Sequence, residues 1–205
     1  MAVFAAVILV IAATERELDL VDGVDKLCCG IGPVEAALAT ARALADHSPR
    51  AVIHIGIAGA RRLPPRTLVI GSEAVYCDIL DAEATMPRIE RVPAASELVD
   101  AARRALPSAR VLPIATCGRV GGGAACDVEA MEGFAVLRAA QLAAVPAVEI
   151  RAISNAVHHA DRSMWQIEDA LAALAEAMAN LIPEVDRATI SAERHLQVDP
   201  IWGGE

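Results

Sequence analysis

Residues 128–155 read V-E-A-M-E-G-F-A-V-L-R-A-A-Q-L-A-A-V-P-A-V-E-I-R-A-I-S-N and determine the fold expected for this chain. Met131 and Glu132 open an apolar run with helical spacing, which Pro146 ends. Residues 147–153 are rich in β-branched side chains, and this predicts a buried strand. A helix that leads directly into a buried strand is typical of α/β proteins.

The strand predicted over 147–153 ends at Ser154 and Asn155, two short polar residues. Ligands of open α/β sheets bind beyond the carboxyl ends of the strands. Glu132, which enters the helix, and Asn155, which leaves the strand, are therefore expected to converge on one pocket.

Outward from this stretch, strand-like and helix-like segments alternate along the chain. Further strands are expected at 3–12, 26–29, 51–55, 68–75 and 111–116, and further helices at 34–47, 96–106 and 163–181. The alternation predicts an α/β fold, a single-domain three-layer α/β/α arrangement with a mostly parallel central sheet. We expect this domain to span 1–182 and a loosely attached polar tail to span 183–205.

Three stretches between these elements are expected to be irregular. Residues 56–60 are predicted as a turn of small residues and 81–93 as a polar loop. Residues 117–123 are the richest in glycine, which favours a mobile loop over a site.

The composition fits one domain built around aliphatic side chains. Of the 205 residues, 55% are hydrophobic and only 2% are aromatic. This suits a buried sheet of Val, Ile and Leu under Ala-rich helices. The net charge of −9 and the lack of a basic run argue against nucleic acid or an anionic membrane as a partner.

The cysteines and histidines indicate neither disulfides nor a metal site. The five cysteines include no C-x-x-C pair, so we expect buried thiols in a reducing cytoplasm. The histidines lack metal-ligand spacing, so no metal is expected. The apolar residues 1–13 are too short to span a bilayer, and their β-branched content favours a strand over a signal peptide.

Two short motifs lie close to predicted strand ends. Gly30-Ile31-Gly32-Pro33 allows the backbone to approach a ligand closely, or forms a tight turn. It is not the G-x-G-x-x-G fingerprint, so neither a dinucleotide nor another cofactor is expected. Thr14 and Glu17 fit a capping box, and Glu17 alternatively faces the pocket from the end of the first strand.

Several stretches together resemble the nucleoside phosphorylase/nucleosidase superfamily. They are A-A-T-E-R-E (12–17), C-G-I-G-P-V-E-A-A-L (29–38), G-I-A-G-A (56–60), E-A-V-Y-C-D (73–78), V-E-A-M-E-G-F-A-V (128–136) and R-A-I-S-N (151–155). The resemblance is to the hydrolytic branch, which includes 5′-methylthioadenosine/S-adenosylhomocysteine nucleosidases and futalosine hydrolases. It implies a small-molecule purine nucleoside as ligand and a homo-oligomeric cytoplasmic enzyme.

This resemblance implies roles for individual residues. Glu17 matches the carboxylate that activates water, and Glu132, with Met131, matches the ribose-binding pair. Ser154 and Asn155 match the pair that addresses the purine near N7. The other residues expected to bind substrate are Gly56, Ala58, Gly59, Thr116, Arg151 and Trp165. The stacking aromatic is expected to be Trp165, Phe134 or a side chain of a partner subunit.

One departure from the family pattern concerns the base. The adenine-directed nucleosidases carry Asp at position 155, where this chain has Asn155. An amide donates one hydrogen bond and accepts another, which suits a 6-oxopurine better than adenine. The segment S-N-A-V-H-H-A-D-R-S-M-W-Q-I (154–167) resembles the futalosine hydrolases, whose substrate carries hypoxanthine. This predicts a futalosine hydrolase of menaquinone biosynthesis.

Alternatives remain at this stage. The chain is alternatively a methylthioadenosine-type nucleosidase, or a purine-binding member that lost catalysis when Asp became Asn. Water is favoured over phosphate as the nucleophile, because Glu17 would repel phosphate and Arg61 and Arg62 are expected to be exposed. Asp161 and Arg162 are candidates for contacting a polar substituent on the sugar side.

Overall fold

The computed structural model describes residues 8–79, 88–123, 125–159 and 161–197. Its strands are β1 (Ile8–Ala12), β2 (Asp25–Cys28), β3 (Ala51–Ala60), β4 (Leu68–Tyr76), β5 (Arg91–Pro93), β6 (Arg110–Thr116), β7 (Val128–Ala130) and β8 (Ala147–Ala156). Its helices are α1 (Glu15–Leu18), α2 (Pro33–Asp46), α3 (Ser96–Ala105), α4 (Gly133–Leu142), the 3₁₀ helix η1 (Arg162–Met164) and α5 (Ile167–Gln197). None of the helices in these ranges is long and apolar enough to cross a membrane.

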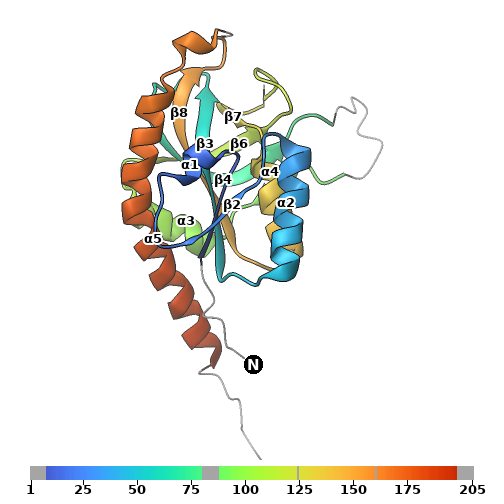
Figure 1. The fold of residues 1–205 in the computed structure, drawn as a ribbon, viewed down its shortest axis with the longest axis vertical. Coiled ribbons are helices and arrows are strands. Elements are labelled where there is room, and N and C mark those ends of the chain that lie inside the picture. Colours follow the sequence, from blue (N-terminus) through green and yellow to red (C-terminus); the bar gives the residue numbers. More distant parts are fainter. Residues whose placement is uncertain (1–7, 80–87, 124, 160, 198–205) are drawn as a thin grey trace, which may run out of the picture.

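The predicted α/β/α layering is confirmed. Helices α2 and α4 cover one face of the sheet, and α3 and α5 cover the other (Figure 1). Alternate residues of the buried strands supply the two layers: Val10 and Ile53 pack toward α3 and α5, whereas Ile11 and Val52 pack toward α2 and α4. This follows from the two-residue period of a strand, which turns successive side chains to opposite faces.

The sheet is mixed rather than purely parallel. Strand β1 pairs in parallel with β2 and β3, and the other parallel pairings join β3 to β8, β4 to β6 and β6 to β7. Antiparallel pairings join β3 to β7, β4 to β5 and β4 to β8. As a result β3, β8, β4, β6 and β7 close into a ring. The ring brings the ends of β3, β7 and β8 to one place, although they lie far apart in the sequence.

The predicted turn at 56–60 is wrong, because β3 continues to Ala60. Its small residues allow close neighbours on both edges, with β8 along its length and β7 at residues 59–60. A register shift between Ala58 and Gly59 replaces the turn. Strands β5 and β7 were not expected, because three residues are too few for a periodic pattern to be recognised.

The tail predicted to begin at residue 183 is also wrong over the described residues. Helix α5 passes through Pro183 and ends at Gln197. Leu181, Val185 and Thr189 are spaced by four residues and are buried, so the apolar stripe of the helix continues beyond the proline. Packing on the sheet therefore outweighs the hydrogen bond that Pro183 removes. Residues 1–7, 80–87 and 198–205 lie outside the described ranges. They hold the start of the strand predicted over 3–12, part of the loop predicted over 81–93 and the end of the tail predicted over 183–205.

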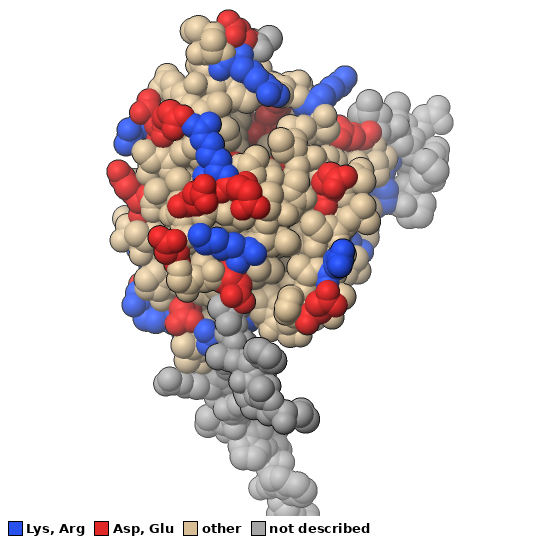
Figure 2. Space-filling view, viewed as in Figure 1, with Lys and Arg blue, Asp and Glu red and all other residues tan. Residues whose placement is uncertain are grey.

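Charged side chains are interspersed over the surface. On the face shown in Figure 2, basic and acidic groups alternate rather than gather by sign. Several form ion pairs that connect separate elements, such as Arg50 with Asp186 of α5 and Arg104 with Glu184. Exposed pairs of this kind contribute little to stability, so the aliphatic core holds the fold together.

Candidate active site

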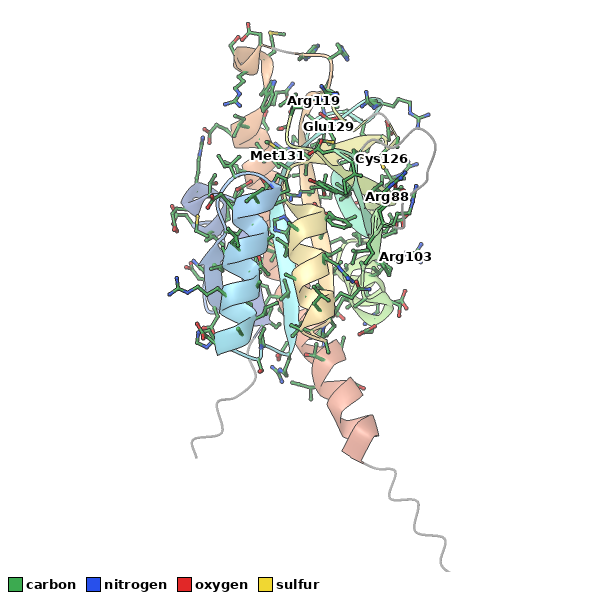
Figure 3. The ribbon with its side chains drawn as sticks, turned by 90° about the vertical axis from the view of Figure 1, so that its right-hand side faces the viewer. Arg88, Arg103, Arg119, Cys126, Glu129 and Met131 are labelled. Carbon is green, nitrogen blue, oxygen red and sulfur yellow. The ribbon has the colours of Figure 1, made fainter. Side chains whose placement is uncertain are left out.

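A cavity of about 330 Å³ lies where the ends of β1, β3, β7 and β8 meet. The predicted site residues that line it are Glu17, Ala58, Gly59, Met131, Glu132, Arg151, Ser154, Asn155 and Trp165. Figure 3 shows Arg119, Glu129 and Met131 gathered at this end of the molecule. Residues from five separate segments are thus brought together, as expected for a site at carboxyl ends of strands.

Glu17 both caps α1 and faces the cavity, the two placements that the sequence left open. It completes a capping box at the start of α1, where its Oε2 accepts hydrogen bonds from Thr14 N (3.1 Å) and Thr14 Oγ1 (2.8 Å). Its Oε1 accepts the N–H of Ile57 on β3 at 3.1 Å. The carboxylate is buried yet lines the cavity. The cap therefore orients a catalytic candidate rather than excluding it.

Glu132 lies directly before helix α4 and faces the cavity. The helix begins at Gly133, one residue later than Glu132, which is its N-terminal capping position. Glu132 Oε1 accepts the N–H of Gly32 at 3.0 Å, so the Gly30–Pro33 turn positions a side chain of the site. Gly32 has a φ of 96°, a conformation that glycine adopts without steric cost.

Arg151 lines the cavity and pairs with two carboxylates. Its Nη2 is 3.5 Å from Glu132 Oε2, and its Nε is 2.8 Å from Glu149 Oε1. Burial alone would lower the pKa of Arg151, but the charges of Glu149, Glu132 and Glu17 raise it above its ordinary value. The guanidinium therefore stays charged inside the protein, where an unpaired cation would be unstable.

Ser154 and Asn155 are buried at the end of β8, beside the cavity. Ser154 Oγ lies 3.2 Å from the Ala58 carbonyl and 2.8 Å from Asn155 Oδ1. Asn155 Nδ2 donates to the Ala156 carbonyl at 3.1 Å. After these bonds, the Nδ2 group of Asn155 still has one N–H free for a ligand, and its Oδ1 still has one free lone pair.

Of the two candidate stacking aromatics within the chain, Trp165 is at the cavity and Phe134 is not. Phe134 stacks on Tyr76 with ring centroids 5.1 Å apart and does not line the cavity, so its predicted role is wrong. Trp165 lines the cavity, and its Nε1 donates to the His159 carbonyl at 3.0 Å. The guanidinium of Arg162 lies over the Trp165 ring, 5.5 Å from its centroid.

Two predicted substrate-binding residues do not line the cavity. Thr116 is fully buried, and its Oγ1 accepts the N–H of Phe134 at 2.7 Å, which caps the first turn of α4. Gly56 lies behind the site, where a Cβ would be 2.1 Å from Arg151 Nη1 and 2.8 Å from Glu17 Oε1. Its contribution is therefore space for these two side chains rather than contact with a ligand.

Sequence reasoning missed Glu129, a buried carboxylate of β7 that lines the cavity. Glu129 accepts the N–H groups of Gly121 (2.5 Å) and Gly123 (3.0 Å) and pairs with Arg61. The glycine-rich loop lies at the site as predicted, but these bonds hold it there. The available signal was an acidic residue two positions before Met131. It was not recognised because β7 has only three residues.

His54 and Glu149 were also missed as parts of the site. Both are fully buried, and both contact Arg151. Each interrupts an otherwise apolar strand, and a polar group in a buried strand requires a partner. A polar residue within an apolar strand therefore indicates a buried polar contact. It does not show which residue makes that contact.

The five cysteines are free thiols, and Cys29, Cys117 and Cys126 are buried. Burial raises the pKa of Cys29 to about 12. It also raises the pKa values of Cys77, Cys117 and Cys126 above their ordinary range. A thiol is nucleophilic as the thiolate, so these residues are inert core groups at neutral pH.

Comparisons with known proteins agree with this geometry. Residues 26–126 match the model of the phosphorylase superfamily. Futalosine hydrolase of Streptomyces coelicolor is 36% identical over 194 residues, with 82% of each chain covered.

Solved structures share the fold. A 5′-methylthioadenosine/S-adenosylhomocysteine nucleosidase of Neisseria meningitidis, in complex with methylthio-immucillin-A, superposes with a TM-score of 0.74 at 24% identity, covering 86% of this chain and 98% of the other. A futalosine hydrolase mutant of Helicobacter pylori superposes with a TM-score of 0.68 at 17% identity, covering 90% and 98%. The chain therefore belongs to the phosphorylase superfamily, and within it to the hydrolases of N-glycosidic bonds.

Proposed function

We propose that this protein hydrolyses the N-glycosidic bond of a 6-oxopurine nucleoside, with futalosine as the substrate and hypoxanthine as the released base. One observation carries the proposal: Glu17, Glu132 and Asn155, from three separate segments, line the same cavity. The relative that is 36% identical is a futalosine hydrolase, which supports this choice of substrate.

On the sugar side, two carboxylates suit an oxocarbenium-like transition state. Cleavage leaves positive charge on the sugar and negative charge on the base. Glu17, held by Thr14 and by the Ile57 N–H, takes a proton from the attacking water. Glu132 accepts hydrogen bonds from ribose hydroxyls, and its charge stabilises the sugar cation.

On the base side, Asn155 recognises the purine. Its free N–H donates to N7 or to the neighbouring O6, both of which are acceptors on this edge of a 6-oxopurine. Asn155 does not supply a proton, so the leaving group must be stabilised as an anion by hydrogen bonds. Hypoxanthine is the better leaving group for such a site, because its carbonyl delocalises the negative charge.

Water is the proposed nucleophile rather than phosphate. Arg61 and Arg62, which could in principle bind phosphate, pair with acidic side chains: Arg61 Nη2 is 3.4 Å from Glu129 Oε2, and Arg62 Nε is 3.2 Å from Asp127 Oδ1. Glu17 would in addition repel a phosphate trianion or dianion in the cavity.

The outer part of the cavity suits an anionic substituent on the sugar. Arg119 and Arg162 line it, and neither side chain has an ion pair among the described residues. Arg16 also lines it but is paired with Glu168. Two guanidinium groups without an ion pair within the described ranges, that of Arg162 lying over Trp165, favour a planar carboxylate, which arginine binds through two hydrogen bonds.

We also propose a homo-oligomer in the cytoplasm, working in menaquinone biosynthesis. Ile31, Val34 and Leu38 are exposed along the start of α2, and Leu142 is exposed at the end of α4. Ile31 also lines the cavity, so a second copy packed here would close the site. Light scattering after size exclusion tests this; a monomer at micromolar concentration contradicts it.

The test of the function is base release from futalosine, inosine and methylthioadenosine, each with and without phosphate. Hypoxanthine from futalosine at a rate independent of phosphate is the expected result. Adenine from methylthioadenosine would contradict the role of Asn155. Phosphate dependence would make the enzyme a phosphorylase, with the anion held by Arg119 and Arg162. No release from any of the three would leave a purine-binding protein.

A further inference from the structure

A layer of polar groups lies beneath the cavity without touching it. His54 on β3 and Glu149 on β8 are both fully buried, and neither lines the cavity. The two strands are parallel, and His54 is in register with Glu149. Arg151 lies two residues beyond Glu149 and therefore on the same face of the sheet. The register thus places a histidine, a carboxylate and an arginine together.

Arg151 is held by several groups, of which only Glu132 carries a function in the cavity. Its Nη2 meets both His54 Nε2 and Glu132 Oε2, the latter at 3.5 Å. Its Nη1 donates to the Ile57 carbonyl at 3.4 Å, and its Nε donates to Glu149 Oε1 at 2.8 Å. The position of the guanidinium, and so the support it gives Glu132, depends on groups that never touch a ligand.

His54 is a neutral acceptor toward Arg151. Its Nδ1 lies 3.0 Å from the Ile11 carbonyl, which only accepts, so Nδ1 carries the hydrogen. Nε2 is then a lone pair that faces an N–H of Arg151. Burial, and next the charge of Arg151, lower the pKa of His54 well below its ordinary value, so the ring stays neutral.

Glu149 completes this layer from the neighbouring strand β8. Its Oε2 has no hydrogen-bond partner among the described residues and lies against Gly133, where a Cβ would be 2.2 Å away. Helix α4 begins at Gly133, so the partial positive charge of its N-terminus faces this oxygen. Among the described residues, the Glu149 carboxylate therefore accepts its hydrogen bond from Arg151 through Oε1 alone.

We propose that His54 is a positioning residue for ribose recognition, acting through Arg151 on Glu132, with Glu149 holding the same guanidinium through its Nε. The inference rests on the proposed nucleosidase function, in which Glu132 binds the sugar hydroxyls. Without an acceptor at position 54, an N–H of Arg151 is buried without a partner. The guanidinium relieves this only by moving, and Glu132 then loses its support.

The test compares His54→Phe and His54→Leu, which remove the acceptor, with His54→Gln, whose amide offers a carbonyl to Arg151 and an N–H to Ile11. The Phe variant keeps the ring volume and the Leu variant avoids overpacking, so either one that folds is sufficient. The readouts are the inosine to 2′-deoxyinosine ratio of kcat/KM and the Kd for hypoxanthine.

In the apolar variants we expect the inosine to 2′-deoxyinosine ratio of kcat/KM to fall about tenfold. Their Kd for hypoxanthine should stay within roughly twofold of wild type, because the base lies against β8. The Gln variant should keep the preference. In Glu132→Gln, adding His54→Phe should lower the ratio no further, since both changes act on one hydrogen-bond chain.

Two outcomes overturn the inference while the function stands. One is an unchanged ribose preference in a folded, active apolar variant. The other is a loss of hypoxanthine binding that parallels the loss of preference, with no rescue by Gln, because this indicates a general loosening of the core. If the wild-type protein releases no base from any nucleoside, the proposed function is wrong. The positioning role rests on that function and is then wrong as well.

Discussion

The buried charged groups at and beneath the inner end of the cavity differ from those at its rim in how their charges are stabilised. The inner cluster, defined as Glu17, His54, Glu132, Glu149 and Arg151, is buried, and each member is held by a hydrogen bond. The rim, defined as Arg119, Arg162 and Trp165, is at least partly exposed, and its arginines have no ion pair within the described ranges. Catalysis requires side chains that are held in fixed positions. Side chains that would only contact a substituent of the substrate can be held more loosely.

This difference has an energetic basis. A buried charge that loses its partner is strongly destabilised, so every member of the inner cluster depends on the others. An exposed arginine is solvated by water and loses little when it has no partner. Substitutions in the inner cluster should therefore have large, coupled effects, and substitutions at the rim should have small, additive ones.

The largest effect is expected for Glu17→Gln. Glutamine still fits the capping box of α1, but it cannot take a proton from water, so kcat should fall by roughly 10²–10⁴-fold. The Kd for hypoxanthine in calorimetry should change little. Glu15→Gln, an exposed change on the same helix, is the control and should be near wild type. Equal losses in turnover and base binding would refute the role of Glu17.

Gly56→Ala should be nearly as damaging, although Gly56 touches no ligand. Its Cβ would lie 2.1 Å from Arg151 Nη1, so the inner cluster must rearrange. We expect kcat/KM to fall by more than about 100-fold, since small misplacements of catalytic groups have effects of this size. Circular dichroism checks that the variant folds. Full activity of Gly56→Ala would show that the cluster tolerates displacement.

Asn155→Asp should change selectivity rather than remove activity. A carboxyl group can protonate N7 of adenine but no longer donates an amide N–H. The ratio of kcat/KM for methylthioadenosine over inosine should rise by at least about tenfold. Base release followed by chromatography measures it, and an unchanged ratio would contradict the role of Asn155 in recognising the base.

At the rim, Arg162→Ala and Arg119→Ala should act weakly and separately. Each should raise KM for futalosine by about 3- to 30-fold and leave kcat and the kinetics with inosine nearly unchanged. The effect should shrink as salt rises, because exposed charges are screened. Equal effects on futalosine and inosine would show that the arginines do not contact the sugar substituent.

The smallest effect concerns pH and stability. The pKa of His54 is lowered well below 6.5, so the folded protein binds its proton less readily than the unfolded chain. Its contribution to stability is therefore present above pH 6.5 and is lost as pH falls toward the folded pKa. Arg151 and Glu149 face the ring. Burial raises the pKa of Glu149, which has the opposite effect, a contribution lost as pH rises above 4.5.

A comparison of wild type with His54→Gln isolates the histidine, because Glu149 is present in both. Between pH 7 and pH 5 the Tm of wild type should fall by more than that of the variant. The difference should be about 2–4 °C for each kcal/mol of linkage. Scanning fluorimetry at several pH values measures it, and parallel Tm profiles would contradict the shifted pKa of His54.

Local patterns in the sequence were sufficient for much of the fold and for several of the residues that line the cavity. The strand at 147–153, the capping box at Thr14 and the pairing of Glu132 with Asn155 in one pocket were all predicted, and the structure has them. Such features depend on hydrophobic period, turn residues and caps, which act between residues a few positions apart.

Only the tertiary structure decided the closure of the sheet into a ring, the continuation of α5 through Pro183 and the partners of Arg151. Each depends on contacts between residues far apart in the chain. Arg151 meets His54 from 97 positions away, and Gly32 reaches Glu132 across 100. The sequence by itself showed that His54 and Glu149 are polar residues in buried strands. Which partner satisfies each was settled by packing, because a buried polar group is stable only where the fold supplies its hydrogen bond.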